Sequence, residues 1–132
     1  MASDYRKFAQ TAVISGTDAN GLTHWYNGTG KRIAIIQSTV KIVPDVSVSQ
    51  HAANTMLFEL LNGTDVIADW DTTTTTGDGA LTAGTVASMT AGAASGKLLE
   101  VAAAGVLKWK GTKAGTGPAY AASCSFEYYE LA

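Results

Sequence analysis

The chain is poor in charge. Charged side chains make up 15% of its 132 residues, against about 25% in typical soluble domains. Two interpretations fit this composition equally well: a surface that another protein partly covers, or polar sheet faces built from serine and threonine hydroxyls. The net charge is -2 and no basic block is present. Binding to nucleic acid therefore has no electrostatic support, and we expect no nucleic-acid partner.

Cysteine and histidine are also scarce, which removes most metal and nucleophile chemistry. Cys124 is the single cysteine and excludes an internal disulfide. His24 and His51 are the only histidines, and nothing pairs them at the spacing of a zinc site. A nucleophilic Cys124–histidine pair, or a glycosidase pair among the glutamates, is a minor alternative to structural roles. We expect no enzyme, no cofactor and no resident metal.

Two other motifs match the sequence only in part. The glycine-rich stretch 27–32 faintly resembles a phosphate loop, but Trp25 stands where its first glycine is needed and Arg32 follows the lysine. A glycine turn is the better interpretation. Asp69 and Asp71 precede a Thr/Gly loop over 72–79, and Asp78 lies within it. Cation binding there stays open, since Ca²⁺ takes six to eight oxygen ligands and these carboxylates could supply some of them.

Long apolar runs are absent as well. No stretch approaches the ~18 apolar residues that a membrane span needs, so we expect no membrane partner. The segment Met1–Gln10 carries Asp4, Arg6 and Lys7 and lacks the apolar region of a signal peptide. This predicts synthesis in a cytoplasm.

What the sequence does contain is alternation. Tyr120, Ala122, Cys124, Phe126 and Tyr128 recur at every second position and predict a half-buried strand over 119–131. The opposite face of that strand is nearly uncharged, which suits burial against a sibling subunit. Its members are Ser123, Ser125, Glu127 and Tyr129.

Similar patterns predict further strands. Over 32–43 we expect one strand with Ala34, Ile36, Val40 and Ile42 on a common face. Asn62-Gly63 predicts a hairpin between 56–61 and 64–70. A three-residue loop with positive φ at Gly63 places Met56, Phe58, Leu60, Val66, Ala68 and Trp70 on one face and Glu59, Asp65 and Asp69 on the other.

The overall count is about eight short strands separated by turns. This predicts an all-β, jelly-roll-like antiparallel β-sandwich with a short N-terminal arm. Residues 1–16 are expected to form the arm or a first edge strand, and residues 17–132 a single domain. The Ala-rich stretch 91–104 is interpreted as a strand near 97–102, with a short helix as the alternative.

The run from Arg32 to Leu131 resembles the jelly-roll capsid decoration (cement) and head-fibre proteins of tailed bacteriophages. The features that carry the resemblance are the strand Ile33–Val43, the segment Phe58–Thr64 leading into Ile67–Asp69, Ala104–Leu107, and the glycine-rich turn before Tyr128–Glu130. It implies a homotrimer on the virion surface that binds and stabilises the shell of the major capsid protein. The alternative is a receptor- or carbohydrate-binding module of a fibre or tail.

Partner-binding residues are expected on the N-terminal segment and on exposed aromatics. An N-terminal segment of this kind can add a strand to an exposed sheet edge. Trp25 would serve the carbohydrate-binding alternative. The candidates are Tyr5, Phe8, Val13, Ile14, Trp25 and Tyr129.

Overall fold

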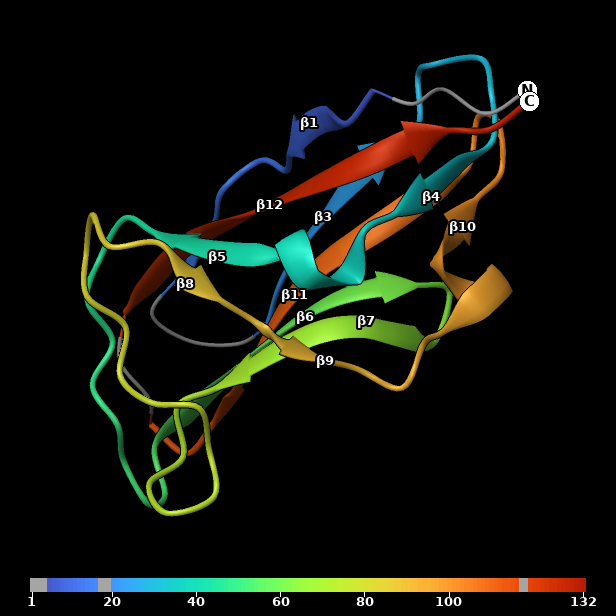
Figure 1. Ribbon diagram of the computed structural model, residues 1–132. Coiled ribbons are helices and arrows are strands. Elements are labelled where there is room, and N and C mark those ends of the chain that lie inside the picture. The colour runs from blue at the N-terminus through green and yellow to red at the C-terminus, as the bar shows by residue number, and fades with distance from the viewer. Residues whose placement is uncertain (1–4, 17–19, 117–118) are drawn as a thin grey trace.

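The computed structural model describes residues 5–16, 20–116 and 119–132, which form two antiparallel β-sheets packed face to face (Figure 1). These residues contain no α-helix, only two short 3₁₀ helices, η1 (Gln37–Thr39) and η2 (Gly96–Leu99). The all-β expectation is confirmed.

We name the two sheets A and B. In sheet A the long strand β12 is central, with β1 and β2 along one side and β4 and β5 along the other. Its strands are β1 (Lys7–Gln10), β2 (Ile14–Gly16), β4 (Ile33–Ile35), β5 (Lys41–Pro44), β8 (Ala87–Ser88), β10 (Glu100–Val101) and β12 (Tyr120–Glu130). Sheet B has the order β3 (Gly21–Tyr26), β11 (Val106–Ala114), β6 (Thr55–Asn62), β7 (Asp65–Asp71) and β9 (Thr90–Ala91).

The strand order is that of a jelly roll. Taken as continuous segments, β1–β2, β4–β5 and β8–β10 each occupy one strand position, which leaves eight positions in the described chain. The last of these segments is counted in sheet A through β8 and β10, while β9 between them pairs with β7 of sheet B. Sheet A then runs 1-8-3-6 and sheet B runs 2-7-4-5, the order produced by two interlocked Greek keys. The predicted jelly-roll-like sandwich is therefore confirmed.

The core lies between the sheets, and the alternation of the last strand is confirmed. All five residues predicted to point inward from β12 are buried. The indole of Trp109 stacks on Phe58, with ring centroids 5.8 Å apart. Its Nε1 donates to the carbonyl oxygen of Ala122 at 3.0 Å and so ties sheet B to sheet A. Burying a polar indole requires such a partner.

The predicted single strand over 32–43 is wrong, because η1 interrupts it. Ile33 and Ile35 are buried before the turn, whereas Val40 and Ile42 are buried after it, so the inward phase reverses. The Thr39 hydroxyl donates to the carbonyl oxygen of Ile36 at 2.6 Å and accepts the Glu127 N–H at 2.9 Å. These two bonds stabilise a turn that periodicity alone does not reveal.

The hairpin forms as expected, but the predicted loop length is wrong. Asn62 pairs with Asp65, so only Gly63 and Thr64 form the turn, with Gly63 at φ 65°. A bulge beside Leu60 and Leu61 then shifts the register, so that Leu60 faces Ala68 and Phe58 faces Trp70. Of the set predicted to share the inner face, Val66 instead lies opposite Leu61. The bulge places apolar and charged side chains on different faces, which a three-residue loop was expected to do.

Two further expectations are refined. The stretch 91–104 contains both predicted alternatives in succession, η2 and then β10. Ser123 and Ser125 do not form an open seam, because they are 1% and 6% exposed within a single copy of the chain. Gln10 Nε2 donates to Ser123 Oγ at 2.9 Å, so a neighbouring side chain already covers this serine.

The N-terminal segment is part of the sandwich. β1 pairs with β12 from Lys7↔Tyr128 to Gln10↔Ser125, and β2 pairs with the same strand further along. Between them, Thr11 Oγ1 accepts the N–H of Cys124 at 3.0 Å. Within the described residues β1 and β2 have no strand on their other side, so this segment is an edge of sheet A.

Candidate interaction surface

The ladder registers define the outer face of each sheet, because residues opposite each other in an antiparallel pair point to the same side. Sheet A exposes a face in which small and hydroxyl-bearing side chains predominate. Its members are Phe8, Gln10, Ser15, Ala34, Lys41, Val43, Ser88, Glu100, Ala121, Ser123, Ser125, Glu127 and Tyr129.

The edge of sheet A carries the most exposed apolar side chains of the N-terminal segment. Tyr5 is 79% exposed, Phe8 67% and Val13 47%. Phe8 lies opposite Glu127 on the outer face. Arg6 Nε donates to the Tyr129 hydroxyl at 3.2 Å, and this bond is the main reason that the pKa of Arg6 is raised. The apolar side chains of this edge stand beside two cations, Arg6 and Lys7, and two acids, Glu127 and Glu130.

Two of the expected partner-binding residues point into the core instead. Ile14 is 4% exposed and faces Ala122 across the ladder. Trp25 lies edge-on against Phe126, with ring centroids 5.1 Å apart and an interplanar angle of 81°. Its side chain is partly buried and packs against the core. Tyr129 is half-buried beside Arg6. The structure therefore brings Tyr5, Phe8 and Val13 to one exposed edge and separates them from Ile14 and Trp25.

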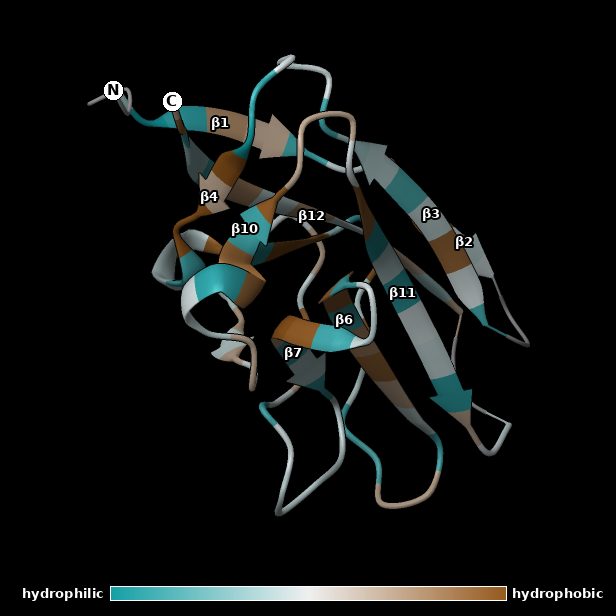
Figure 2. Cartoon of the chain, turned by 90° about the vertical axis from the view of Figure 1, so that its right-hand side faces the viewer, coloured by the Kyte–Doolittle hydropathy of each residue, from teal (hydrophilic) through white to brown (hydrophobic). Residues whose placement is uncertain are grey.

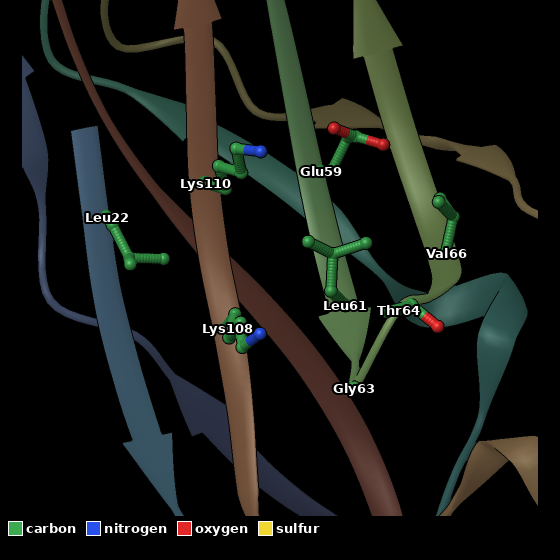
Figure 3. A pocket seen from close by; sticks show the side chains of 8 residues that line it. All are labelled: Leu22, Glu59, Leu61, Gly63, Thr64, Val66, Lys108 and Lys110. Carbon is green, nitrogen blue, oxygen red and sulfur yellow. The ribbon is translucent and has the colours of Figure 1, made fainter. Parts of the chain in front are cut away.

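The outer face of sheet B is hollowed. An open depression of about 380 Å³ spans β3, β11, β6 and the start of β7, with the hairpin turn at one end. Figure 3 shows Leu22 of β3 pointing toward β11, and Lys110 extending toward Glu59 of β6. The apolar part of the lining is Leu22, Leu61 and Val66, and the polar part is Glu59, Gly63, Thr64, Lys108 and Lys110.

The two lysines of the depression differ in their surroundings. Lys110 lies opposite Glu59 in the ladder, whereas Lys108 lies between His24 and Leu61. Neither ammonium has a carboxylate within 4.0 Å among the described residues; the ion pairs there join Lys7 and Lys31 to Glu130, and Arg32 to Glu100. Lys108 is thus a cation on an apolar floor with no acid beside it in the ladder.

Acidic groups gather on the far side of Glu59. Asp69 lies opposite Glu59, and partial burial raises the pKa of Asp69, with smaller contributions from Asp78, Glu59 and Asp71. The outer face of sheet B therefore passes from apolar and aromatic at β3, through cationic at β11, to acidic at β6 and β7. Figure 2 shows β3 and β11 coloured by the hydropathy of each residue.

Two of the residues considered for catalysis, Cys124 and His51, have structural roles. Burial raises the pKa of the Cys124 thiol, which disfavours the thiolate needed for attack. His51 Nδ1 accepts the N–H groups of Ala53 and Asn54 at 3.0 and 2.9 Å, so this histidine caps a loop. No group of three or more His, Cys, Asp or Glu in residues 5–16, 20–116 and 119–132 is arranged to hold a metal ion.

The acidic loop and the glycine-rich turn are also held by hydrogen bonds within the chain. Asp78 Oδ2 accepts the N–H of Asp71 at 2.7 Å, and Asp71 Oδ1 accepts the N–H of Thr73 at 2.8 Å. Asn27 Nδ2 donates to the carbonyl oxygens of Lys31 and Ala102, which braces the turn of the glycine-rich stretch against the loop before β11. Within the described part of the chain, no helix is long and apolar enough to cross a membrane.

Sequence reasoning did not identify the depression. Alternation places Lys108 and Lys110 on one face of β11 and the buried Leu107 and Trp109 on the other, and this assignment is correct. The signal that was available is that Leu22 alternates with the half-buried Thr23 and Trp25. Nothing local places Leu22 beside Lys110, because that contact depends on β3 pairing with β11.

Comparisons with known proteins give no family. No protein-family model matches the chain, and no curated protein matches its sequence. Among solved structures, the infectious bursal disease virus Gx strain structure is similar over 96% of this chain and 32% of that chain, with 14% identity and a TM-score of 0.36. The VP2 subviral particle of that virus is similar over 97% and 37%, with 13% identity and a TM-score of 0.29. This chain spans about a third of the length of those proteins.

Proposed function

We propose that this protein is a non-enzymatic virion structural protein, a capsid decoration protein that assembles as a trimer and stabilises a shell of major capsid protein. The observation that carries the proposal is the exposed apolar edge at Tyr5, Phe8 and Val13. It lies on a jelly roll in which the Cys124 thiol is buried and the side chains of His51 and Asp78 are engaged in loop contacts. Exposed apolar side chains gathered at one edge are typical of a surface that another protein covers.

The sparse charge supports the same proposal. The charged members of the outer face of sheet A are Lys41, Glu100 and Glu127. Interfaces between subunits are depleted of charge at their centre. Of the two interpretations of the low charge content, the hydroxyl-rich face accounts for the middle of sheet A, and a covered surface accounts for the edge.

Two measurements on the purified protein test this function. Sedimentation velocity is expected to give a species of three chains. Co-expression with the major capsid protein encoded in the same genome is expected to yield shells that carry the protein after sedimentation and that withstand a higher temperature than bare shells. A monomer that stays in the supernatant would overturn the proposal.

The alternative is a carbohydrate- or receptor-binding module, and one observation favours it. His24 and Tyr26 are exposed on β3, with ring centroids 6.3 Å apart, and Tyr26 is 67% exposed. Trp25 does not supply this platform because its ring packs inward. Binding on a glycan array that is lost in Tyr26→Ala and kept in Leu98→Ala would support this function in place of decoration.

A further inference from the structure

The exposed edge of sheet A presents one prominent aromatic side chain beside an acid. Phe8 is 67% exposed and lies opposite Glu127 on the outer face of the sheet. β1 pairs with β12 on one side and with no strand on its other side in the described residues. Phe8 therefore projects from the border of the sandwich, where a neighbouring molecule can reach it.

The outer face of sheet B presents the complementary features. The depression of about 380 Å³ has an apolar floor of Leu22, Leu61 and Val66. That volume lies in the lower part of the range of about 300–1,000 Å³ found for binding pockets. Lys108 stands at this floor with no carboxylate within 4.0 Å in the described residues. The hairpin turn leaves one end open, because a side chain built at Gly63 would contact nothing within 4 Å.

We infer that Phe8 of one copy of this chain seats in the depression of the next copy, with Glu127 of the first copy against Lys108 of the second. The inference deepens the proposed function and rests on it, because it names a seam between copies of the chain in the proposed assembly. An apolar side chain with an adjacent acid meets an apolar floor with an adjacent base. Aromatic anchors in a pocket carry much of the energy of protein interfaces.

The contact joins two different surfaces of the molecule, so it is heterologous and each copy both gives and receives a side chain. Phe8 points outward from sheet A, and the depression opens outward from sheet B.

The seam is tested by sedimentation equilibrium with substitutions on both sides. Phe8→Ala is expected to raise at least about tenfold the concentration at which half of the chains are monomeric. Val86→Ala is the matched control, since Val86 is 50% exposed beside β8, on the other edge of sheet A from β1, and it is expected to leave assembly unchanged. Thermal melting of each variant checks that the monomer still folds. Folding is expected to be retained in Phe8→Ala, because Phe8 is exposed.

A charge exchange makes the test specific to the paired residues. Lys108→Glu and Glu127→Lys are each expected to weaken assembly, and the double variant to recover most of the loss. Lys41→Glu, on the same outer face as Glu127, is the control. If the wild-type chain is a trimer and the Phe8 and Lys108 variants remain trimers of equal stability, the seam is wrong while the proposed function stands. If the wild-type chain is a monomer that binds no shells, the proposed function fails and the seam with it.

Discussion

The outer faces of the two sheets differ in how they are covered. On sheet A, Ser123 and Ser125 are almost inaccessible because neighbouring longer side chains, such as Gln10, cover them. On sheet B, Lys108, Lys110 and Glu59 stand around a depression that remains open. Short side chains in the middle of a sheet are closed off by their neighbours, whereas long charged ones leave space between them. The surfaces open to a partner are therefore the edge of sheet A and the face of sheet B.

The largest expected effect on stability comes from a larger side chain at a covered position of sheet A. Ser123→Leu is expected to lower the free energy of unfolding by about 2–3 kcal/mol, because the added carbons have no space beside Gln10 and the hydroxyl acceptor is lost. Thr112→Leu, at a half-buried outward position of sheet B, is expected to change it by no more than about 0.5 kcal/mol. Urea denaturation measures both. Equal costs would show that the two faces do not differ in packing.

A smaller effect is expected where the N-terminal segment joins sheet A. Thr11→Val keeps the side-chain volume but leaves the buried N–H of Cys124 without its acceptor. We expect a loss of about 1–2 kcal/mol in the free energy of unfolding. Thr23→Val, a half-buried position on β3, is the matched control and should cost little. An unchanged stability in Thr11→Val would mean that this segment is held independently of β12.

The smallest effect concerns the acidic side of sheet B. The folded state raises the pKa of Asp69, so the protonated form is favoured on folding. The stability contributed by this group is full below its unfolded pKa and is lost as pH rises through its raised folded pKa. At pH 7, Asp69→Asn is therefore expected to raise the melting temperature modestly, by an amount equivalent to about 0.5 kcal/mol. At pH 3 the difference should vanish; the same gain at both pH values would rule out charge as its cause.

Much of the fold was predictable from local alternation. The buried face of β12, the inward Leu107 and Trp109, and the all-β class follow from a period of two, because successive side chains of a strand point to opposite sides. The failures occur where a hydrogen-bonded turn or a β-bulge breaks that period. Thr39 reverses the phase of 32–43, and the bulge beside Leu61 shifts the hairpin.

The candidate surface was predictable only in part. Tyr5, Phe8 and Val13 were expected at the surface and are exposed, whereas Ile14 and Trp25 turn inward. The N-terminal segment carries no charge pattern or turn that indicates its pairing with β12. The depression was missed because its lining comes from four strands, and their adjacency depends on sheet order.

The all-β class, the sparse charge and the inward side of most strands can be derived from the amino-acid order alone. These properties are local, since the pleat of a strand sets the direction of each side chain. The position of Phe8 beside Glu127, and the depression that Leu22 shares with Lys108 and Leu61, follow from the pairing of the strands. Those neighbours come from distant parts of the chain, and the packing of the two sheets brings them together.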